Sequence, residues 1–278
     1  MQIFYQIKEN DMVLKDKIKA GQKIYGTMIR VVRNPALAYI IKNSGLDFVM
    51  YDCEHSNYSM ETLHDLFITG NAIGISSFLR VPNLEKQYIS RALDQGAVGV
   101  MTPMISTPEM ARELVVYSKY QPLGNRGFSA GIAHTDYAAV GGHVNIMKHS
   151  NDKVISIAQI ETKLAIDNAE AIAAVDGIDV LLVGPNDLSL ALGIPGDLMN
   201  PIELDAIAHV AAACKKYGKA FGIHATAPML KVFYDDLSVV MMQSDIDFLG
   251  AGFRSVKETF GAQWRMPQRP LWENGELI

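Results

Sequence analysis

Short apolar runs alternate with longer segments of helical periodicity, and this alternation occurs eight times along the chain. The runs are rich in Val, Ile, Leu and Phe, which is typical of strands buried in a parallel sheet. We predict strands at 22–29, 46–52, 75–80, 98–103, 154–161, 178–184, 219–225 and 247–252. Eight strand–helix units predict an α/β fold of the closed (β/α)8 type, the TIM barrel.

An open, doubly wound sheet is the alternative fold. Such a sheet more often carries a Gly-rich nucleotide loop after its first strand, whereas this chain has TMIRVVRNP there. The GAGF motif at 250–253 could form a phosphate loop, but close packing at a strand end is the simpler explanation. A chain of 278 residues is long enough for one barrel. We therefore predict a single domain over 1–278, with its core at about 20–255.

Composition excludes several classes of function. The chain has 25 Lys and Arg against 30 Asp and Glu, a net charge of −5, and no basic block, so nucleic acid is not an expected partner. No segment reaches about 18 uninterrupted apolar residues, and the first residues lack the apolar core of a signal peptide. We expect a soluble, cytoplasmic protein without membrane attachment.

The two cysteines, Cys53 and Cys214, do not have the spacing of zinc ligands. Cys53 could be a nucleophile, but a structural thiol is the simpler interpretation.

Two segments depart from the regular alternation. The connection at 121–153 is longer than usual and holds five of the 22 glycines, so we expect it to serve an interface or the active site. The tail at 264–278 contains both tryptophans, Trp264 and Trp272, which suggests a contact between subunits.

Polar side chains fall at or just after the ends of four predicted strands. They are Asp52 with His55, Arg80, Gln159 with Glu161, and Asp187. In a TIM barrel the active site lies at this end of the strands, and a buried charge without a partner is costly. We therefore expect these residues to form one site.

Each of these residues has a chemical and a structural interpretation. Glu161 and Asp187 offer the hard oxygens that suit Mg²⁺ or Mn²⁺, or each could cap a helix. Asp52 could orient His55 as a general base, or could satisfy backbone donors. Arg80 could bind an enolate or carboxylate oxygen, or form a structural ion pair. We expect Glu54 to cap or pair at the surface.

Lysine placement argues against one mechanism. Lys23, Lys153 and Lys219 stand at strand starts, and no predicted strand ends in Lys. A Schiff-base aldolase needs a lysine amine at the reacting end. Metal chemistry is therefore favoured.

The ordered motifs resemble those of the HpcH/HpaI family of metal-dependent class II pyruvate aldolases over about residues 20–255. They are DCEH (52–55), LRVP (79–82), GAVGVMTPM (96–104), PLGNRG (122–127), AQIET (158–162) and VGPNDLS (183–189). The resemblance implies that Glu161 and Asp187 bind Mg²⁺, Mn²⁺ or Co²⁺, that Arg80 binds the keto or enolate oxygen, and that His55 and Asp52 are the acid/base pair. It also implies that Gln159, and the backbone around Asn186 and Asp187, contact the substrate.

The same resemblance implies hexamers, a C-terminal helix exchanged between neighbours, and pyruvate plus an aldehyde as the small-molecule partners. The chain departs from the family pattern at Cys53, where glycine is common, which affects the expected aldehyde preference more than the metal chemistry. We predict cleavage of a 4-hydroxy-2-oxo acid into pyruvate and an aldehyde.

Two alternatives remain. A CoA-thioester lyase of the citrate lyase β or malyl-CoA lyase type would need a basic groove for CoA, and none stands out in the sequence. A catalytically silent barrel that binds 2-oxo acids would not need Arg80, His55, Glu161 and Asp187 together.

Overall fold

The computed structural model describes residues 14–138, 141–260, 272–273 and 276–277. The chain divides into two compact units, one up to Asp245 and one from Ile246 onward.

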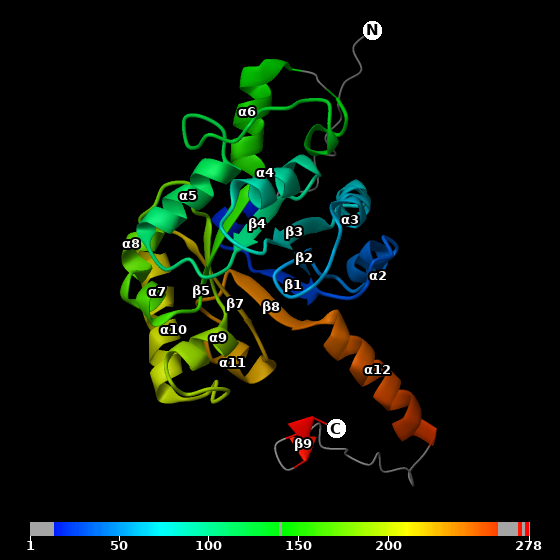
Figure 1. The fold of residues 1–278 in the computed structure, drawn as a ribbon, viewed down its shortest axis with the longest axis vertical. Coiled ribbons are helices and arrows are strands. Elements are labelled where there is room, and N and C mark those ends of the chain that lie inside the picture. The colour runs from blue at the N-terminus through cyan, green and yellow to red at the C-terminus, as the bar shows by residue number, and fades with distance from the viewer. Residues whose placement is uncertain (1–13, 139–140, 261–271, 274–275, 278) are drawn as a thin grey trace. The chain divides into compact units, whose positions relative to one another are not determined.

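The first unit is built around eight parallel strands (Figure 1). Each strand pairs with the next along the chain, and β1 pairs with β8, so the sheet closes into a barrel. This confirms the predicted TIM barrel. The strands are β1 (Ile24–Ile29), β2 (Phe48–Asp52), β3 (Ser76–Arg80), β4 (Gly99–Thr102), β5 (Ile155–Ile160), β6 (Val180–Val183), β7 (Ala220–Ala225) and β8 (Val239–Ser244).

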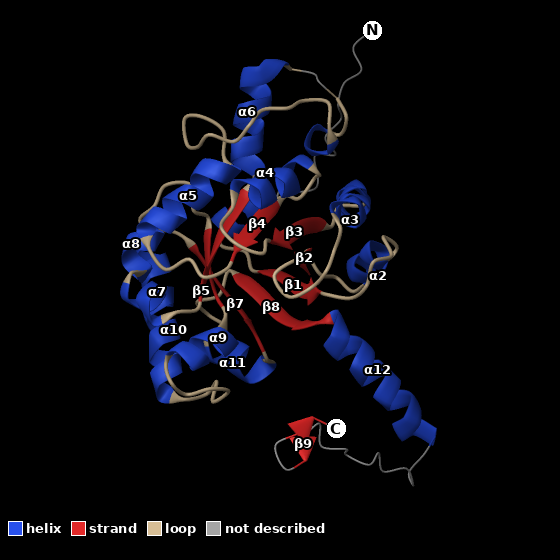
Figure 2. Cartoon of the chain, in the orientation of Figure 1, coloured by secondary structure: helices blue, strands red, loops and turns tan. Residues whose placement is uncertain are grey.

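Helices surround the strands (Figure 2). Several begin where the sequence provides a cap; for example, Thr107 accepts a hydrogen bond from the backbone N–H of Met110, and Pro108 occupies the first turn of α5. The helices of this unit are α1 (Leu14–Lys19), α2 (Leu37–Asn43), α3 (Met60–Ala72), α4 (Lys86–Asp94), α5 (Pro108–Ser118), η1 (Ala133–Thr135), α6 (Gly142–Lys153), α7 (Lys163–Asp167), α8 (Ala169–Ala173), α9 (Pro185–Ala191), α10 (Pro201–Tyr217) and α11 (Ala227–Val232).

The second unit contains helix α12 (Asp245–Phe260), which begins at the last residue of the first unit. It also contains a short antiparallel pair, β9 (Trp272–Glu273) and β10 (Glu276–Leu277). The tail prediction at 264–278 falls mostly outside the described residues, Trp264 included.

The eighth strand was predicted in the wrong place. Residues 247–252 lie in α12, and β8 is the preceding run Val239–Ser244, which pairs with β1 and β7. The run VVMMQS is β-branched and apolar, whereas the apolar residues after it recur at helical spacing. GAGF therefore lies inside a helix and is neither a phosphate loop nor a strand end. The other seven strands agree with the prediction to within two residues at each end.

The barrel interior is apolar at its centre and polar at the carboxyl ends of the strands. Met28, Phe48, Met50 and Phe78 belong to a buried cluster that fills the inside of the barrel. Side chains alternate between the two faces of a strand, so Asp52 follows Met50, and Arg80 follows Phe78, on the inward face. The same alternation therefore places polar side chains at the inner rim of the barrel, which is formed by the carboxyl ends of the strands.

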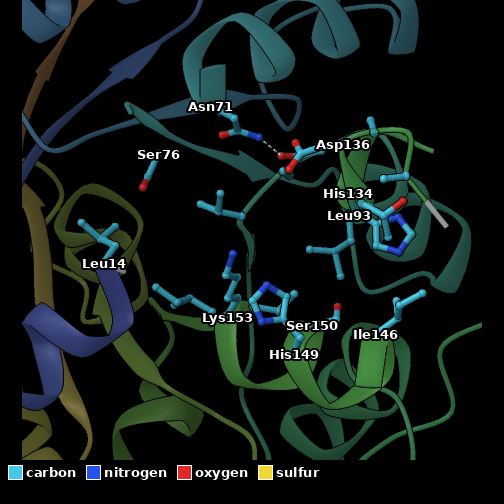
Figure 3. Close-up of a pocket in the computed structure, with 18 of the residues that line it drawn as sticks. Leu14, Asn71, Ser76, Leu93, His134, Asp136, Ile146, His149, Ser150 and Lys153 are labelled. Carbon is cyan, nitrogen blue, oxygen red and sulfur yellow. Dashed lines mark hydrogen bonds between the residues drawn. The ribbon is translucent and has the colours of Figure 1, made fainter. Parts of the chain in front are cut away.

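The long connection at 121–153 reaches the opposite end of the barrel from this rim. It contains η1 and α6, and with the strand starts at Ser76, Val98 and Ile155 it lines a cavity of about 530 Å³. Figure 3 shows His149 and Lys153 of α6 on one side of this cavity and Asn71 of α3 on the other. An α-to-β connection necessarily returns to the strand starts. The described residues of this segment, 121–138 and 141–153, therefore lie away from the predicted active site of their own chain.

Candidate active site

Asp52 ends β2 and is fully buried at the inner rim of the barrel. Burial alone would raise the pKa of this carboxyl, but the hydrogen bonds and charge of Arg80, the backbone N–H of Glu54 and the charge of Arg30 hold the pKa below its ordinary value. Asp52 is therefore a carboxylate at neutral pH. It can anchor cations at this position.

Arg80 ends β3, directly opposite Asp52 in the register of the two strands. Its Nε donates to Asp52 Oδ1 at 2.9 Å, and its Nη2 donates to Asp52 Oδ2 at 2.7 Å. Nη1 lies 2.7 Å from Oε2 of Glu54, and Nη2 also contacts the sulfur of Met28 at 3.8 Å. A guanidinium has five N–H groups, so one N–H on Nη1 is left for another acceptor.

His55 pairs with Glu54 rather than with Asp52. Its Nε2 lies 3.7 Å from Oε2 of Glu54, whereas Asp52 receives only the backbone N–H of His55, at 3.3 Å. The expected Asp52–imidazole contact is therefore absent from the described residues. Glu54 forms a pair, as one of the two expectations had it, but not at the surface, because its side chain is only 18% exposed and lies between Arg80 and His55. The His55 side chain is 55% exposed and faces solvent.

Glu161 follows β5 and is 2% exposed. Its Oε1 accepts the backbone N–H of Met104 at 2.7 Å, and its Oε2 accepts the side-chain amide of Gln159 at 2.6 Å. Burial raises the pKa of Glu161 to about 7; the Met104 N–H opposes this shift, and the negative charges of Glu54 and Asp187 add to it. The site therefore holds several carboxylates that repel one another and would be stabilised by a cation.

Asp187 lies in the first turn of α9, the helix that follows β6. Since β5 and β6 are neighbours, with Ile160 opposite Val183, Asp187 is brought to the same rim as Glu161. The side chains of Asp187 and Asn186 are both exposed. Among the described residues there is no group of three or more His, Cys, Asp or Glu side chains that could hold a metal ion. Any ion bound by the Glu161–Asp187 pair would thus need further ligands from water or substrate.

Gly184 connects β6 to α9 and leaves room for this arrangement. A Cβ at this position would lie 2.6 Å from Oε2 of Glu161 and 2.8 Å from Nε2 of Gln159. Only a glycine lets both side chains keep their places. Gln159, 4% exposed, is thus held beside Glu161.

Two further residues at the rim were missed by the sequence analysis. Arg30 follows β1, and its Nε donates to Asp52 Oδ2 at 3.1 Å. His224 lies in β7 with its Nε2 3.0 Å from the backbone oxygen of Gln243. A carbonyl oxygen only accepts, so Nε2 carries the proton and Nδ1 is the acceptor. Burial lowers the pKa of His224 to about 4, so the ring is neutral near pH 7. Counting alternate inward positions from Met28 would have found Arg30.

The remaining candidates have structural roles. Lys23 Nζ donates to the backbone oxygens of Tyr234 and Leu237, and Lys219 Nζ to those of Val175 and Ile178, so both lysines tie the strand starts together. Burial, followed by the charge of Asp52, raises the pKa of Cys53 to about 11. A protonated thiol is a poor nucleophile, which favours the structural interpretation.

Comparison with known proteins shows which family the chain belongs to. The model of the HpcH/HpaI aldolase/citrate lyase family matches residues 30–233. The chain belongs to this family. Its relatives include a 5-keto-4-deoxy-D-glucarate aldolase of Klebsiella pneumoniae, 32% identical over 78% of this chain and 84% of that enzyme. Another is a 4-hydroxy-4-methyl-2-oxoglutarate aldolase of Chaetomium globosum, 35% identical over 74% of this chain and 77% of that enzyme.

A solved structure of the same family confirms the fold. The HpcH/HpaI aldolase from Desulfitobacterium hafniense DCB-2 has a TM-score of 0.83 and 31% identity, covering 89% of this chain and 97% of that chain. With aldolases among its relatives, this family member is a carbon–carbon lyase. None of the described helices is long and apolar enough to cross a membrane.

Proposed function

We propose that this lyase is a class II aldolase that cleaves, or forms, a 4-hydroxy-2-oxo acid from pyruvate and an aldehyde. The observation that supports it best is that Glu161, which is buried after β5, and Asp187, in the helix turn that follows β6, lie at the same rim as an arginine that has an N–H available. The carboxylate and the ketone of a 2-oxo acid each offer an oxygen, and these two oxygens would complete the coordination of a metal ion that only two protein side chains hold.

A divalent cation such as Mg²⁺, Mn²⁺ or Co²⁺ fits the residues present. Glu161 and Asp187 would hold it, since hard carboxylate oxygens suit these ions and the repulsion between the two acids favours a cation. Gly184 keeps the space around Oε2 of Glu161 clear. Such an ion, when bound, supplies Lewis-acid stabilisation of negative charge on the oxo acid.

The protein's own groups carry the remaining steps. The Nη1 N–H of Arg80 would donate to the oxygen on which the enolate charge develops, and Asp52 fixes the guanidinium in place with two hydrogen bonds. His55 would take the proton from the C4 hydroxyl during cleavage, with Glu54 beside its imidazole. Gln159 and the backbone near Asn186 would orient the oxo acid.

The direct test is an assay of aldehydes with pyruvate in the presence of Mg²⁺, Mn²⁺ or Co²⁺, following formation of the hydroxy-oxo acid. We expect turnover with at least one aldehyde, and loss of turnover in Glu161→Gln and Asp187→Asn. Absence of activity with every aldehyde and metal would favour a silent 2-oxo-acid-binding barrel. The CoA-thioester lyase alternative is less favoured, because the relatives include aldolases of 5-keto-4-deoxy-D-glucarate and of 4-hydroxy-4-methyl-2-oxoglutarate.

We further propose that the enzyme is a homo-oligomer, a hexamer by its resemblance to the family, and that it acts in the cytoplasm. Support for the oligomer comes from α12, whose apolar residues Ile246, Leu249, Phe253 and Val256 recur at helical spacing and are exposed in the single chain.

A further inference from the structure

The cavity at the amino ends of the strands lies at the opposite end of the barrel from the candidate active site. Its volume of about 530 Å³ is in the range of small-molecule sites, and its wall includes the apolar side chains of Leu14, Ile75 and Ile146. These residues come from α1, from the loop before β3 and from α6. The cavity can therefore hold the apolar body of a small organic molecule.

Lys153 brings a positive charge to this cavity. It is the last residue of α6, and Figure 3 shows its side chain beside that of His149, one turn earlier on the same helix. Both residues are exposed in the single chain. Lys153 makes no hydrogen bond or ion pair with any residue that the structure describes. Its ammonium group therefore keeps three N–H donors for a ligand.

The other basic side chains in the wall are already paired or neutral. Nη2 of Arg126 donates to Asp94 Oδ1 at 2.6 Å, and the Arg126 side chain is fully buried, so its charge is compensated. Burial, and then the charge of Arg126, lowers the pKa of His134; burial, and then the charge of Lys153, lowers the pKa of His149. Both imidazoles are thus neutral near pH 7, and each can donate one hydrogen bond.

Asp136 limits the charge that the cavity can accept. It lines the same cavity, and in Figure 3 it lies on the side opposite His149 and Lys153. Its negative charge raises the pKa of His149, so it acts on the same region as Lys153. A ligand with one negative group at Lys153 is favoured, and a second negative group at its other end would be repelled.

We propose that this cavity binds a small monocarboxylate, with the carboxylate at Lys153 and His149 and the apolar body against Leu14, Ile75 and Ile146. The site is separate from the rim that carries Glu161 and Asp187. The inference therefore does not rest on the proposed aldolase function.

Saturation-transfer NMR titrations of the full chain with three probes separate charge from shape. Hexanoate has the proposed chemistry, hexanamide lacks the charge, and adipate adds a second carboxylate at the far end. At about pH 7 we expect the wild type to bind hexanoate roughly tenfold or more tightly than either of the others, as for a charge-assisted hydrogen bond.

Lys153→Gln should raise the Kd of hexanoate to about that of hexanamide and leave the Kd of hexanamide unchanged. Lys148→Gln is the matched control, because Lys148 is an exposed lysine of the same helix that is not part of the cavity wall. It changes the net charge equally and should keep the wild-type preference for hexanoate.

Several results would overturn the proposal. A preference for hexanoate that persists in Lys153→Gln would place the binding elsewhere, such as at the catalytic rim, and an equal loss in both lysine variants would show only an effect of overall charge. Equal or tighter binding of hexanamide or adipate by the wild type would contradict a monocarboxylate site. This last comparison needs no variant to fold.

Discussion

Arg80 is the residue on which the account of the site depends most. Three carboxylate contacts hold its guanidinium at the rim, two to Asp52 and one to Glu54, so its remaining N–H points in a fixed direction. A donor that needs no reorganisation is what stabilises a developing enolate best. His55, in contrast, is exposed and is held only by a 3.7 Å contact with Glu54.

Substitution of Arg80 and substitution of His55 should therefore impair different reactions. Arg80→Ala should lower every reaction that passes through the enolate, by roughly 10²-fold or more, including aldol cleavage, oxaloacetate decarboxylation and exchange of the pyruvate methyl protons. His55→Ala should impair cleavage far more than decarboxylation, because only cleavage has a C4 hydroxyl to deprotonate. Steady-state assays of the three reactions measure this. Equal losses in both variants would show that the two residues do not divide the chemistry as proposed.

Gly184 makes a second prediction at the residue scale. A methyl group there would press on Oε2 of Glu161 and on the amide of Gln159, so Gly184→Ala should lower kcat/KM by about tenfold to a hundredfold through displacement of these groups. Far-UV circular dichroism should stay unchanged. Gly127→Ala is the control, because a Cβ at Gly127 meets nothing within 4 Å. Full activity in Gly184→Ala would mean that the position of Glu161 is not critical.

At the scale of elements, the carboxyl ends of β7 and β8 are joined by His224, whose Nε2 donates to Gln243. The folded-state pKa of His224 is about 4 against an ordinary value of 6.5. Between these values the unfolded chain binds more protons than the folded one, so this histidine makes the protein lose stability as the pH falls from 6.5 toward 4. Above 6.5 it contributes no pH dependence.

His224→Gln, which keeps a donor near Nε2 but does not titrate, should therefore lose less stability on acidification than the wild type. Urea midpoints at about pH 7 and about pH 5 measure the two losses. A loss in the variant as large as that of the wild type would show that His224 is not held neutral in the folded state.

Most elements of the barrel were predictable, because a strand buried on both faces leaves a short apolar run and a helix leaves apolar residues three or four apart. The eighth strand failed for a physical reason: Ile246, Leu249, Phe253 and Val256 are apolar residues at helical spacing, and they follow the true strand directly. A helix that begins immediately after a strand leaves no turn residues to separate the two patterns.

The candidate site was predictable only in part. Polar residues at strand ends identified Asp52, Arg80, Gln159 and Glu161, and the alternation of side chains explains why they share the inner rim. Their pairing was not predictable, since His55 lies in a turn whose direction depends on three-dimensional contacts. In the structure the imidazole of His55 lies beside Glu54, and the Asp52 carboxylate pairs with Arg30 and Arg80.

At the scale of the whole molecule, α12 makes a prediction about assembly. Phe253 and Val256 are 73% and 62% exposed, and a helix with such an apolar stripe is normally covered by a partner. Phe253→Glu should shift the particle to a smaller mass by light scattering, because a charge in a subunit contact is costly. Ala251→Glu, on the other side of the same helix, should not. Unchanged mass in both variants would show that α12 does not form a subunit contact.

The central claim, that Glu161 and Asp187 hold a cation which serves enolate formation from pyruvate, can be tested without knowing the aldehyde. Proton NMR in deuterated buffer follows exchange of the pyruvate methyl protons by the protein with added Mg²⁺, Mn²⁺ or Co²⁺. We expect exchange that stops on chelation of the metal and is abolished in Glu161→Gln and in Asp187→Asn, while both variants keep the wild-type circular dichroism. Exchange that persists after chelation, or in either folded variant, would contradict it.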